Sequence, residues 1–300
     1  MSRLMVDQVL QQAQSYVKDG EIDQARTLYQ TVLDRFPENE LAYKGLAGLQ
    51  LLINDVVKDH SQQAIKKLLN LYEQGKLISV AEQSLILTRQ FPNNYIFWSI
   101  FGFANKSLGR NQDSEFGFRN AVRLNPDYPT GYINIGIALK NQGKLEEAIK
   151  AYDQTILLKP ECADAYNNKG NALNNLDNVQ LALINYKRAI GLNSNFVAAH
   201  YNLGAVFYAL GRYQEAILSC KKVIGLKPNF PDPYNNLGCS LNQLGLYNEA
   251  IACYKMAIRQ NPEFSDVYNN LGKSLNDLGK HEEAIANYRS EEHTSELQSP

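Results

Sequence analysis

Two neighbouring segments near the middle of the chain carry a helical pattern of apolar positions. One runs from 132 to 141 and is followed by Gly143, and the other runs from about 145 to 158 and stops before Pro160. Glycine commonly ends a helix, and the residue before a proline disfavours helical geometry. The apolar positions, three or four residues apart, are Tyr132, Ile135, Leu139, Ala148, Tyr152 and Ile156. The pattern predicts two helices joined by a short turn.

The same pattern returns every 34 residues. The glycines inside the first helix of each pair are Gly102, Gly136, Gly170, Gly204, Gly238 and Gly272. The turn glycines are Gly75, Gly109, Gly143, Gly211, Gly245 and Gly279, with Asp177 in the one vacant place. The second-helix aromatic residues are Phe118, Tyr152, Tyr186, Tyr254 and Tyr288, with Cys220 once in their place. Several series that share one period identify an internal repeat.

Each 34-residue unit is therefore predicted to be an antiparallel helix pair, and the pairs are predicted to stack into an all-α solenoid. A glycine inside a helix costs about 1 kcal/mol relative to alanine, so its recurrence indicates that the paired helices approach closely. We expect a larger residue at Gly204 or Gly238 to destabilise the fold locally.

The motif within one unit is specific. Residues 234–238 read Tyr-Asn-Asn-Leu-Gly, Gly245 follows, residues 249–251 read Glu-Ala-Ile, and Tyr254 and Pro262 complete the unit. This motif recurs over nearly the whole chain and resembles the tetratricopeptide repeat (TPR). The resemblance implies a right-handed superhelical solenoid of antiparallel helix pairs. The resemblance is specific for the fold but only weakly specific for the function, because one fold serves many functions.

The register of the repeat breaks once. We expect residues 1–53 to form a short N-terminal TPR-like helical module, and residues 54–60 to form a linker or irregular junction. Residues 61–288 are predicted to be the TPR array, with six full repeats and a truncated seventh. One continuous solenoid with an irregular junction is an equally open alternative.

The last twelve residues, 289–300, lack the period, the small residue and the proline of a repeat. The string resembles the conceptual translation of a sequencing adaptor. We therefore interpret residues 289–300 as a non-native tail, and we expect the natural chain to continue beyond 288.

Composition and charge exclude several classes of function. The chain has 30 Lys and Arg against 31 Asp and Glu, a balance that argues against nucleic-acid binding or a polybasic membrane patch. Four cysteines without CxxC spacing indicate reduced thiols of a cytoplasmic protein. No metal-ligand spacing, nucleotide-binding glycine motif or nucleophile–base arrangement is present, so we expect no cofactor, no metal and no catalytic residue in this segment.

Asparagine is the polar residue that recurs with the period. Five of them stand two residues before the first-helix glycine, namely Asn134, Asn168, Asn202, Asn236 and Asn270. Asn171, Asn174 and Lys140 accompany them in the first helices. Asparagine is a poor helix former, and its carboxamide matches the amide groups of an extended peptide. Peptide binding and packing between helices both remain open as its role.

The TPR resemblance places the first helices on the concave surface, so the five asparagines should form a ladder there, as in O-linked N-acetylglucosamine transferases. A chaperone-docking clamp of Lys and Arg is disfavoured, because the facing positions are mostly Asn or apolar and Lys140 and Lys273 are isolated. We expect a non-catalytic scaffold that binds an extended segment of a protein or peptide partner. The alternative is the substrate-recruiting N-terminal part of a longer glycosyltransferase, O-GlcNAc-transferase-like enzyme or sulfotransferase. The oligomeric state is left open.

Overall fold

The computed structural model describes the backbone of residues 3–298 and the side chains of residues 6–52 and 58–289. The secondary structure of the described residues consists of sixteen α-helices. They are α1 (Arg3–Lys18), α2 (Ile22–Arg35), α3 (Glu40–Glu73), α4 (Leu77–Gln90), α5 (Tyr95–Ser107), α6 (Asn111–Leu124), α7 (Pro129–Asn141), α8 (Leu145–Leu158), α9 (Ala163–Asn175), α10 (Val179–Leu192), α11 (Val197–Ala209), α12 (Tyr213–Leu226), α13 (Pro231–Gln243), α14 (Tyr247–Gln260), α15 (Ser265–Asp277) and α16 (His281–Gln298).

The chain divides into two compact units, Met1–Ile100 and Phe101–Pro300. In the first unit, α1 and α2 pair and share a hydrophobic core with the first part of α3. The predicted junction at residues 54–60 is helical and lies within α3, which then packs against α4. The assignment of residues 1–53 to one module and of 61–288 to one array stays a prediction.

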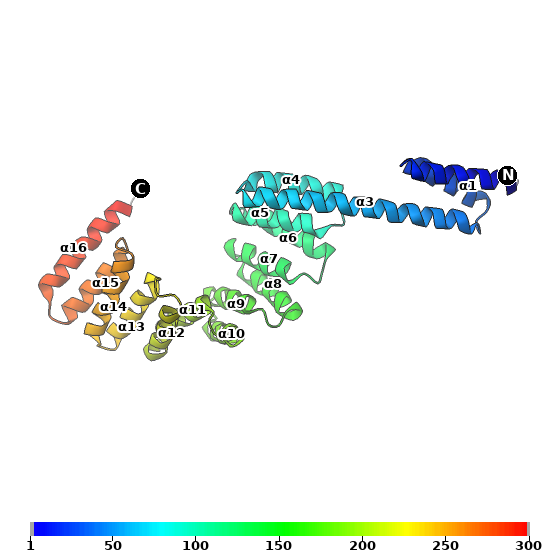
Figure 1. Cartoon of the computed structure of the whole chain (residues 1–300). Helices are drawn as coiled ribbons and strands as arrows, with labels where there is room; N and C mark the ends of the chain where they lie inside the picture. Colours follow the sequence, from blue (N-terminus) through cyan, green and yellow to red (C-terminus); the bar gives the residue numbers. More distant parts are fainter. Residues whose placement is uncertain (1–2, 299–300) are drawn as a thin grey trace. The chain divides into compact units, whose positions relative to one another are not determined.

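In the second unit the helices pack in chain order, each second helix lying against its own first helix and against the first helix of the next repeat. Figure 1 shows this succession from α7 to α16. The predicted all-α solenoid of helix pairs is therefore confirmed. Local contacts of this kind mean that each repeat is stabilised mainly by its neighbours.

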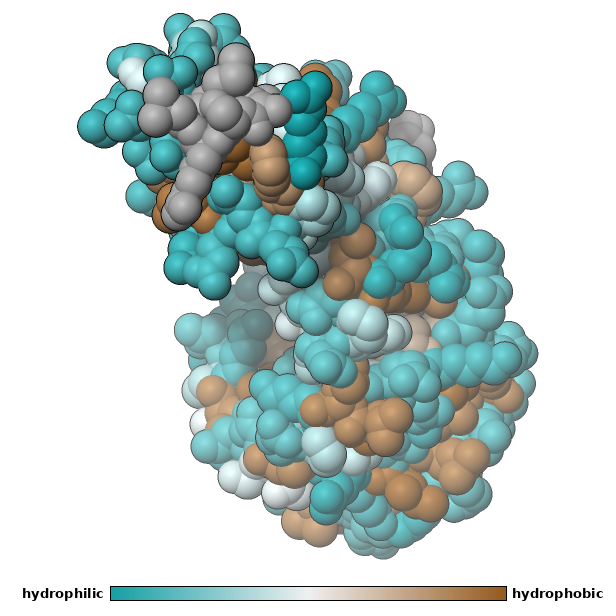
Figure 2. Space-filling model, turned by 90° about the vertical axis from the view of Figure 1, so that its right-hand side faces the viewer, coloured by the Kyte–Doolittle hydropathy of each residue, from teal (hydrophilic) through white to brown (hydrophobic). Residues whose placement is uncertain are grey.

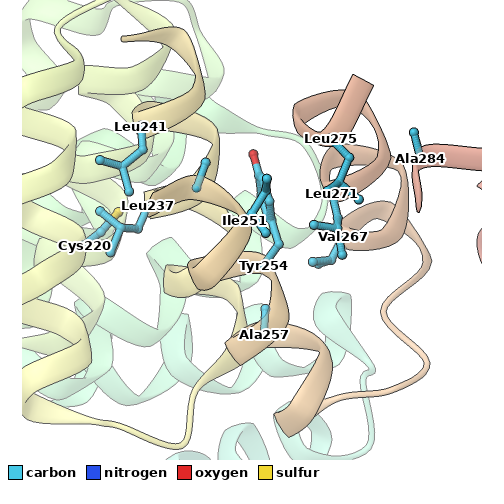
Figure 3. Close-up of a cluster of buried hydrophobic side chains, with 11 residues drawn as sticks. Cys220, Leu237, Leu241, Ile251, Tyr254, Ala257, Val267, Leu271, Leu275 and Ala284 are labelled. Carbon is cyan, nitrogen blue, oxygen red and sulfur yellow. The ribbon is translucent and has the colours of Figure 1, made fainter. Parts of the chain in front are cut away.

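The core of the last repeats shows why the glycines recur. Figure 3 shows Leu237 and Leu241 of α13, Tyr254 of α14 and Leu271 of α15 converging in one buried cluster. A β-carbon on Gly238 would lie only 2.5 Å from Cε1 of the Tyr254 ring, well inside van der Waals contact. The expected close approach of the paired helices is confirmed at this position.

The turns between paired helices use a left-handed residue. Gly245 has a φ of 75°, and Asp177, which replaces glycine in the equivalent turn two repeats earlier, has a φ of 57°. Asp is among the few residues that tolerate this region. The substitution therefore keeps the turn geometry that the repeat requires.

Hydrophobic residues are interspersed with hydrophilic ones over the face shown in Figure 2. Among the described residues, no helix combines the length and the apolarity that crossing a membrane requires. The predicted non-native tail begins inside α16, whose backbone is helical to Gln298. That the tail is non-native stays a prediction.

Candidate functional site

The first helices of consecutive repeats lie side by side on one surface of the second unit. Direct contacts join α7 to α9, α9 to α11, α11 to α13 and α13 to α15. No comparable contact joins consecutive second helices in the part of the chain that the structure describes. Consecutive repeats therefore touch directly through their first helices. We call this surface the first-helix face.

Hydrogen bonds between neighbouring repeats hold several of the predicted asparagines on this face. Asn202 Nδ2 donates to Asn167 Oδ1, and Asn270 Nδ2 donates to Asn235 Oδ1, both at 3.0 Å. Each bond reaches back one repeat, to the residue one place before the equivalent asparagine. It uses one amide hydrogen and leaves the Oδ1 of Asn202 and Asn270 able to accept another bond.

Asn236 has a different neighbour in the preceding repeat. The preceding repeat has Tyr201 at the place of Asn167, and the Asn236 carboxamide lies near enough to the Tyr201 phenol to lower its pKa, against the larger effect of burial. Burial is the main cause that raises the pKa of Tyr201, so this phenol stays protonated at neutral pH. Hydrogen bonds between repeats thus set the carboxamide orientation of Asn202 and Asn270, and Asn202, Asn236 and Asn270 are all half-buried.

Asn134 differs from the other predicted ladder residues. Its side chain is buried, with 4% exposure. Nδ2 donates to the Thr130 carbonyl at 2.7 Å, and Oδ1 accepts from Lys106 Nζ at 2.7 Å. Both ends of the carboxamide are engaged within the protein, so Asn134 serves the contact between α5 and α7.

Asn168 is half-buried and forms no side-chain hydrogen bond with any described residue. Asn202 bonds to the residue 35 positions before it. The equivalent partner for Asn168 would be residue 133, which is Ile. An isoleucine side chain offers no hydrogen-bonding group. The whole carboxamide of Asn168 is therefore available on the first-helix face.

A cavity of about 340 Å³ opens between α7, α9, α10 and α11, and Asn171, one turn along α9 from Asn168, lines it. It brings together four of the predicted site residues, namely Lys140, Asn171, Asn174 and Asn202. The remaining lining residues are Asn175, Tyr186, Ala205, Val206 and Ala209. Lys140 is the charged residue of this lining, and its ammonium makes no ion pair or hydrogen bond with the described residues.

Tyr186 holds Asn171, one of the asparagines that line the cavity. Its Oη donates to Asn171 Oδ1 at 2.8 Å. Burial raises the pKa of Tyr186 to about 12, so the phenol remains a donor at neutral pH. The bond fixes Asn171 with its amide hydrogens free, because only its oxygen is used.

The small residues of the cavity are not among the site residues predicted from the sequence. Ala205 and Ala209 of α11 stand one period after Asn171 and Asn175 of α9. Alanine at these places leaves the room that the cavity occupies. A comparison of equivalent positions between repeats would have found this exchange of asparagine for alanine.

The described residues offer little that resembles a reaction centre. None of them form a group of three or more His, Cys, Asp or Glu arranged to hold a metal ion. Burial raises the pKa of Cys220 to about 12 and that of Cys253 to about 11, so both thiols are protonated and poorly nucleophilic at neutral pH. The polar groups of the first-helix face are hydrogen-bonding groups suited to binding.

Comparison with known proteins agrees with this geometry. Three family models described as tetratricopeptide repeat match residues 10–58 and 133–195, 197–230 and 231–264, and 253–286. Together these matches span more than half of the chain. No curated protein matches the chain.

Solved structures share the fold at low sequence identity. A tetratricopeptide repeat protein from Parabacteroides merdae superposes with a TM-score of 0.61 at 19% identity, covering 78% of this chain and 92% of its own. MamA from Desulfovibrio magneticus gives a TM-score of 0.55 at 22% identity, covering 57% and 97%. YrrB, described as a TPR protein with an unusual peptide-binding site, gives 0.53 at 22%, covering 59% and 91%. The repeat motif, the stacked helix pairs and the family matches together establish that this chain belongs to the tetratricopeptide repeat family.

Proposed function

We propose that the chain is a non-catalytic scaffold that binds an extended segment of a partner protein along its first-helix face. The observation that carries the proposal is the row of carboxamides held at a constant place in successive repeats. YrrB, which shares the fold, is described as peptide-binding.

The chemistry of the row favours recognition of a peptide backbone. An extended peptide presents one N–H and one C=O per residue, and a carboxamide can pair with both. Asn168 has both groups available, while Asn202 and Asn270 keep an acceptor after bonding to the preceding repeat. Backbone contacts of this kind tolerate varied partner side chains, because every residue carries the same main-chain groups.

Replacing Asn168, Asn202 and Asn236 together with Ala tests the proposal. A net hydrogen bond contributes about 0.5–1.5 kcal/mol, so the triple variant should lose roughly ten-fold to a thousand-fold in affinity. The helices should persist, because alanine is the better helix former. Capture from a random 12-residue peptide library, followed by fluorescence anisotropy of the selected peptides, measures the loss.

The matched control replaces Gln180, Gln214 and Asn248 with Ala. These three exposed carboxamides stand at one repeat place on the second helices α10, α12 and α14. The control variant should bind as the natural sequence does. Equal capture by the first-helix variant and the natural sequence, with both folded by circular dichroism, would assign the asparagines to packing and contradict the proposal.

A further inference from the structure

Two lysines occupy equivalent places in successive repeats but have different surroundings. Lys106 of α5 and Lys140 of α7 are one period apart. Lys106 Nζ donates to Asn134 Oδ1 at 2.7 Å, 28 residues further along. The corresponding carboxamide for Lys140 is that of Asn168, yet neither of these two side chains forms a hydrogen bond with any described residue. Lys140 and Asn168 therefore stand where Lys106 and Asn134 stand one repeat earlier, but they are not bonded to each other.

The cavity beside Lys140 has walls of two chemical kinds. Asn171, Asn174 and Asn175 of α9 form a carboxamide wall, and α11 opposite presents Ala205 and Ala209. The lining contains no Asp or Glu, so the Lys140 ammonium has no counter-charge within the cavity. An ammonium and free amide hydrogens are donors for an anion, while the alanine methyl groups suit an aliphatic stem.

We propose that this cavity is a specificity subsite that receives an acidic side chain, Glu or Asp, of the bound partner segment. The proposal rests on the proposed function. The carboxylate pairs with the Lys140 ammonium and accepts amide hydrogens of Asn171 or Asn174, and its methylene groups pack against Ala205 and Ala209. The asparagine row then holds the partner backbone, and Lys140 sets which side chain is preferred at one position.

A side-chain carboxylate fits better than a chain terminus because of where the cavity lies. It is formed by α7, α9, α10 and α11, and further helices of the same unit continue on both sides, α6 before it and α12 to α16 after it. A segment that follows the whole first-helix face passes over this cavity. In either chain direction, a peptide that ended here would cover that face on one side of the cavity only.

The experiment selects peptides from two random 12-residue libraries on the full chain. The first library is amidated at its C-terminus, so its carboxylates are those of side chains. The second has a free C-terminal carboxylate and contains no Asp or Glu. We expect the amidated library to yield peptides with an acidic residue at one fixed position, and replacement of that residue by Gln or Asn to weaken binding about five-fold.

Three single variants assign the preference to Lys140. Lys140→Met should abolish the discrimination between Glu and Gln, and Lys140→Arg should retain it because the positive charge remains. Lys106→Met is the matched control and should discriminate as the natural sequence does, since Lys106 is already engaged with Asn134.

The contrary outcomes separate the two proposals. Selected peptides without an acidic position, or discrimination that survives in Lys140→Met, would overturn the subsite and leave backbone binding in place. Binding confined to the library with a free terminal carboxylate would also overturn it, in favour of a chain terminus. Failure to select any peptide from either library would overturn the proposed function together with the subsite.

Discussion

Tyr152 and Tyr186 occupy the same place in successive repeats, but only one of their hydroxyl groups has a partner. Tyr186 Oη donates to Asn171 Oδ1, whereas Tyr152 Oη is buried and has no hydrogen-bond partner among the described residues. The cause is one residue, because Ile137 stands one period before Asn171. A buried hydroxyl without a partner carries a desolvation penalty that is not recovered.

Removing the two hydroxyl groups should therefore have opposite effects on stability. We expect Tyr152→Phe to raise the free energy of unfolding by about 0.5–1 kcal/mol, because an unpaired polar atom is removed. Tyr186→Phe should lower it by about 0.5–1.5 kcal/mol, because Asn171 loses its partner. Urea midpoints measured by circular dichroism give both shifts, and shifts of the same sign would contradict the argument.

At the scale of helix pairs, the first-helix glycines are not equivalent. A β-carbon on Gly238 would lie 2.5 Å from the Tyr254 ring, and Gly272 meets Tyr288 in the same way. Gly204 instead faces Cys220, and a β-carbon there would meet the Ser219 β-carbon at 3.1 Å. Where cysteine replaces the aromatic residue, the helices leave more room for an added atom.

The expected loss at Gly204 and Gly238 can now be ranked. Gly238→Ala should destabilise by roughly 1–2 kcal/mol, because overpacking of about 1–3 kcal/mol exceeds the gain in helix propensity. Gly204→Ala should stay within about 1 kcal/mol of the natural sequence, because the milder contact and the propensity gain offset each other. Thermal unfolding of the two variants tests the order, and equal losses would show that the aromatic ring is not the cause.

The sequence predicted the elements better than their side-chain environments. Periodic Gly and aromatic residues located the helix pairs, because they are dictated by close packing within each unit. The segment 54–60 was expected to be a linker or irregular junction because it is polar, but it contains no Gly or Pro and continues α3 as a helix. Polar composition alone does not end a helix, since solvent-exposed helical positions are commonly polar.

For the candidate site, the sequence located the carboxamide row but not the state of each member. Asn134 and Asn168 are indistinguishable in the repeat pattern. They differ because Lys106 donates a hydrogen bond to Asn134, whereas the Lys140 side chain donates none to Asn168. That difference depends on side-chain directions in two separate helices, which no periodicity encodes. The cavity likewise depends on Ala205 and Ala209 facing the asparagines of α9.

At the scale of the whole molecule, the hydrophobic core is a series of local clusters. One cluster joins the N-terminal helices α1, α2 and α3, and another joins α12 to α16 around Tyr254. The two clusters share no residue. In repeat proteins, stability is approximately a sum of repeat terms and nearest-neighbour terms, so damage to one cluster should remain close to it.

Hydrogen exchange of a Gly238→Leu variant tests this locality. Leucine cannot fit against the Tyr254 ring, so protection should fall in α13 and α14 and, less strongly, in α12 and α15. Protection in α1 and α2 should be unchanged. Gly225→Leu is the matched control, because Gly225 is exposed on α12 and a β-carbon there meets nothing within 4 Å. This control should retain protection throughout the array. Loss of protection in α1 and α2 together with α13 would show that the chain unfolds as one cooperative body, contrary to the nearest-neighbour argument.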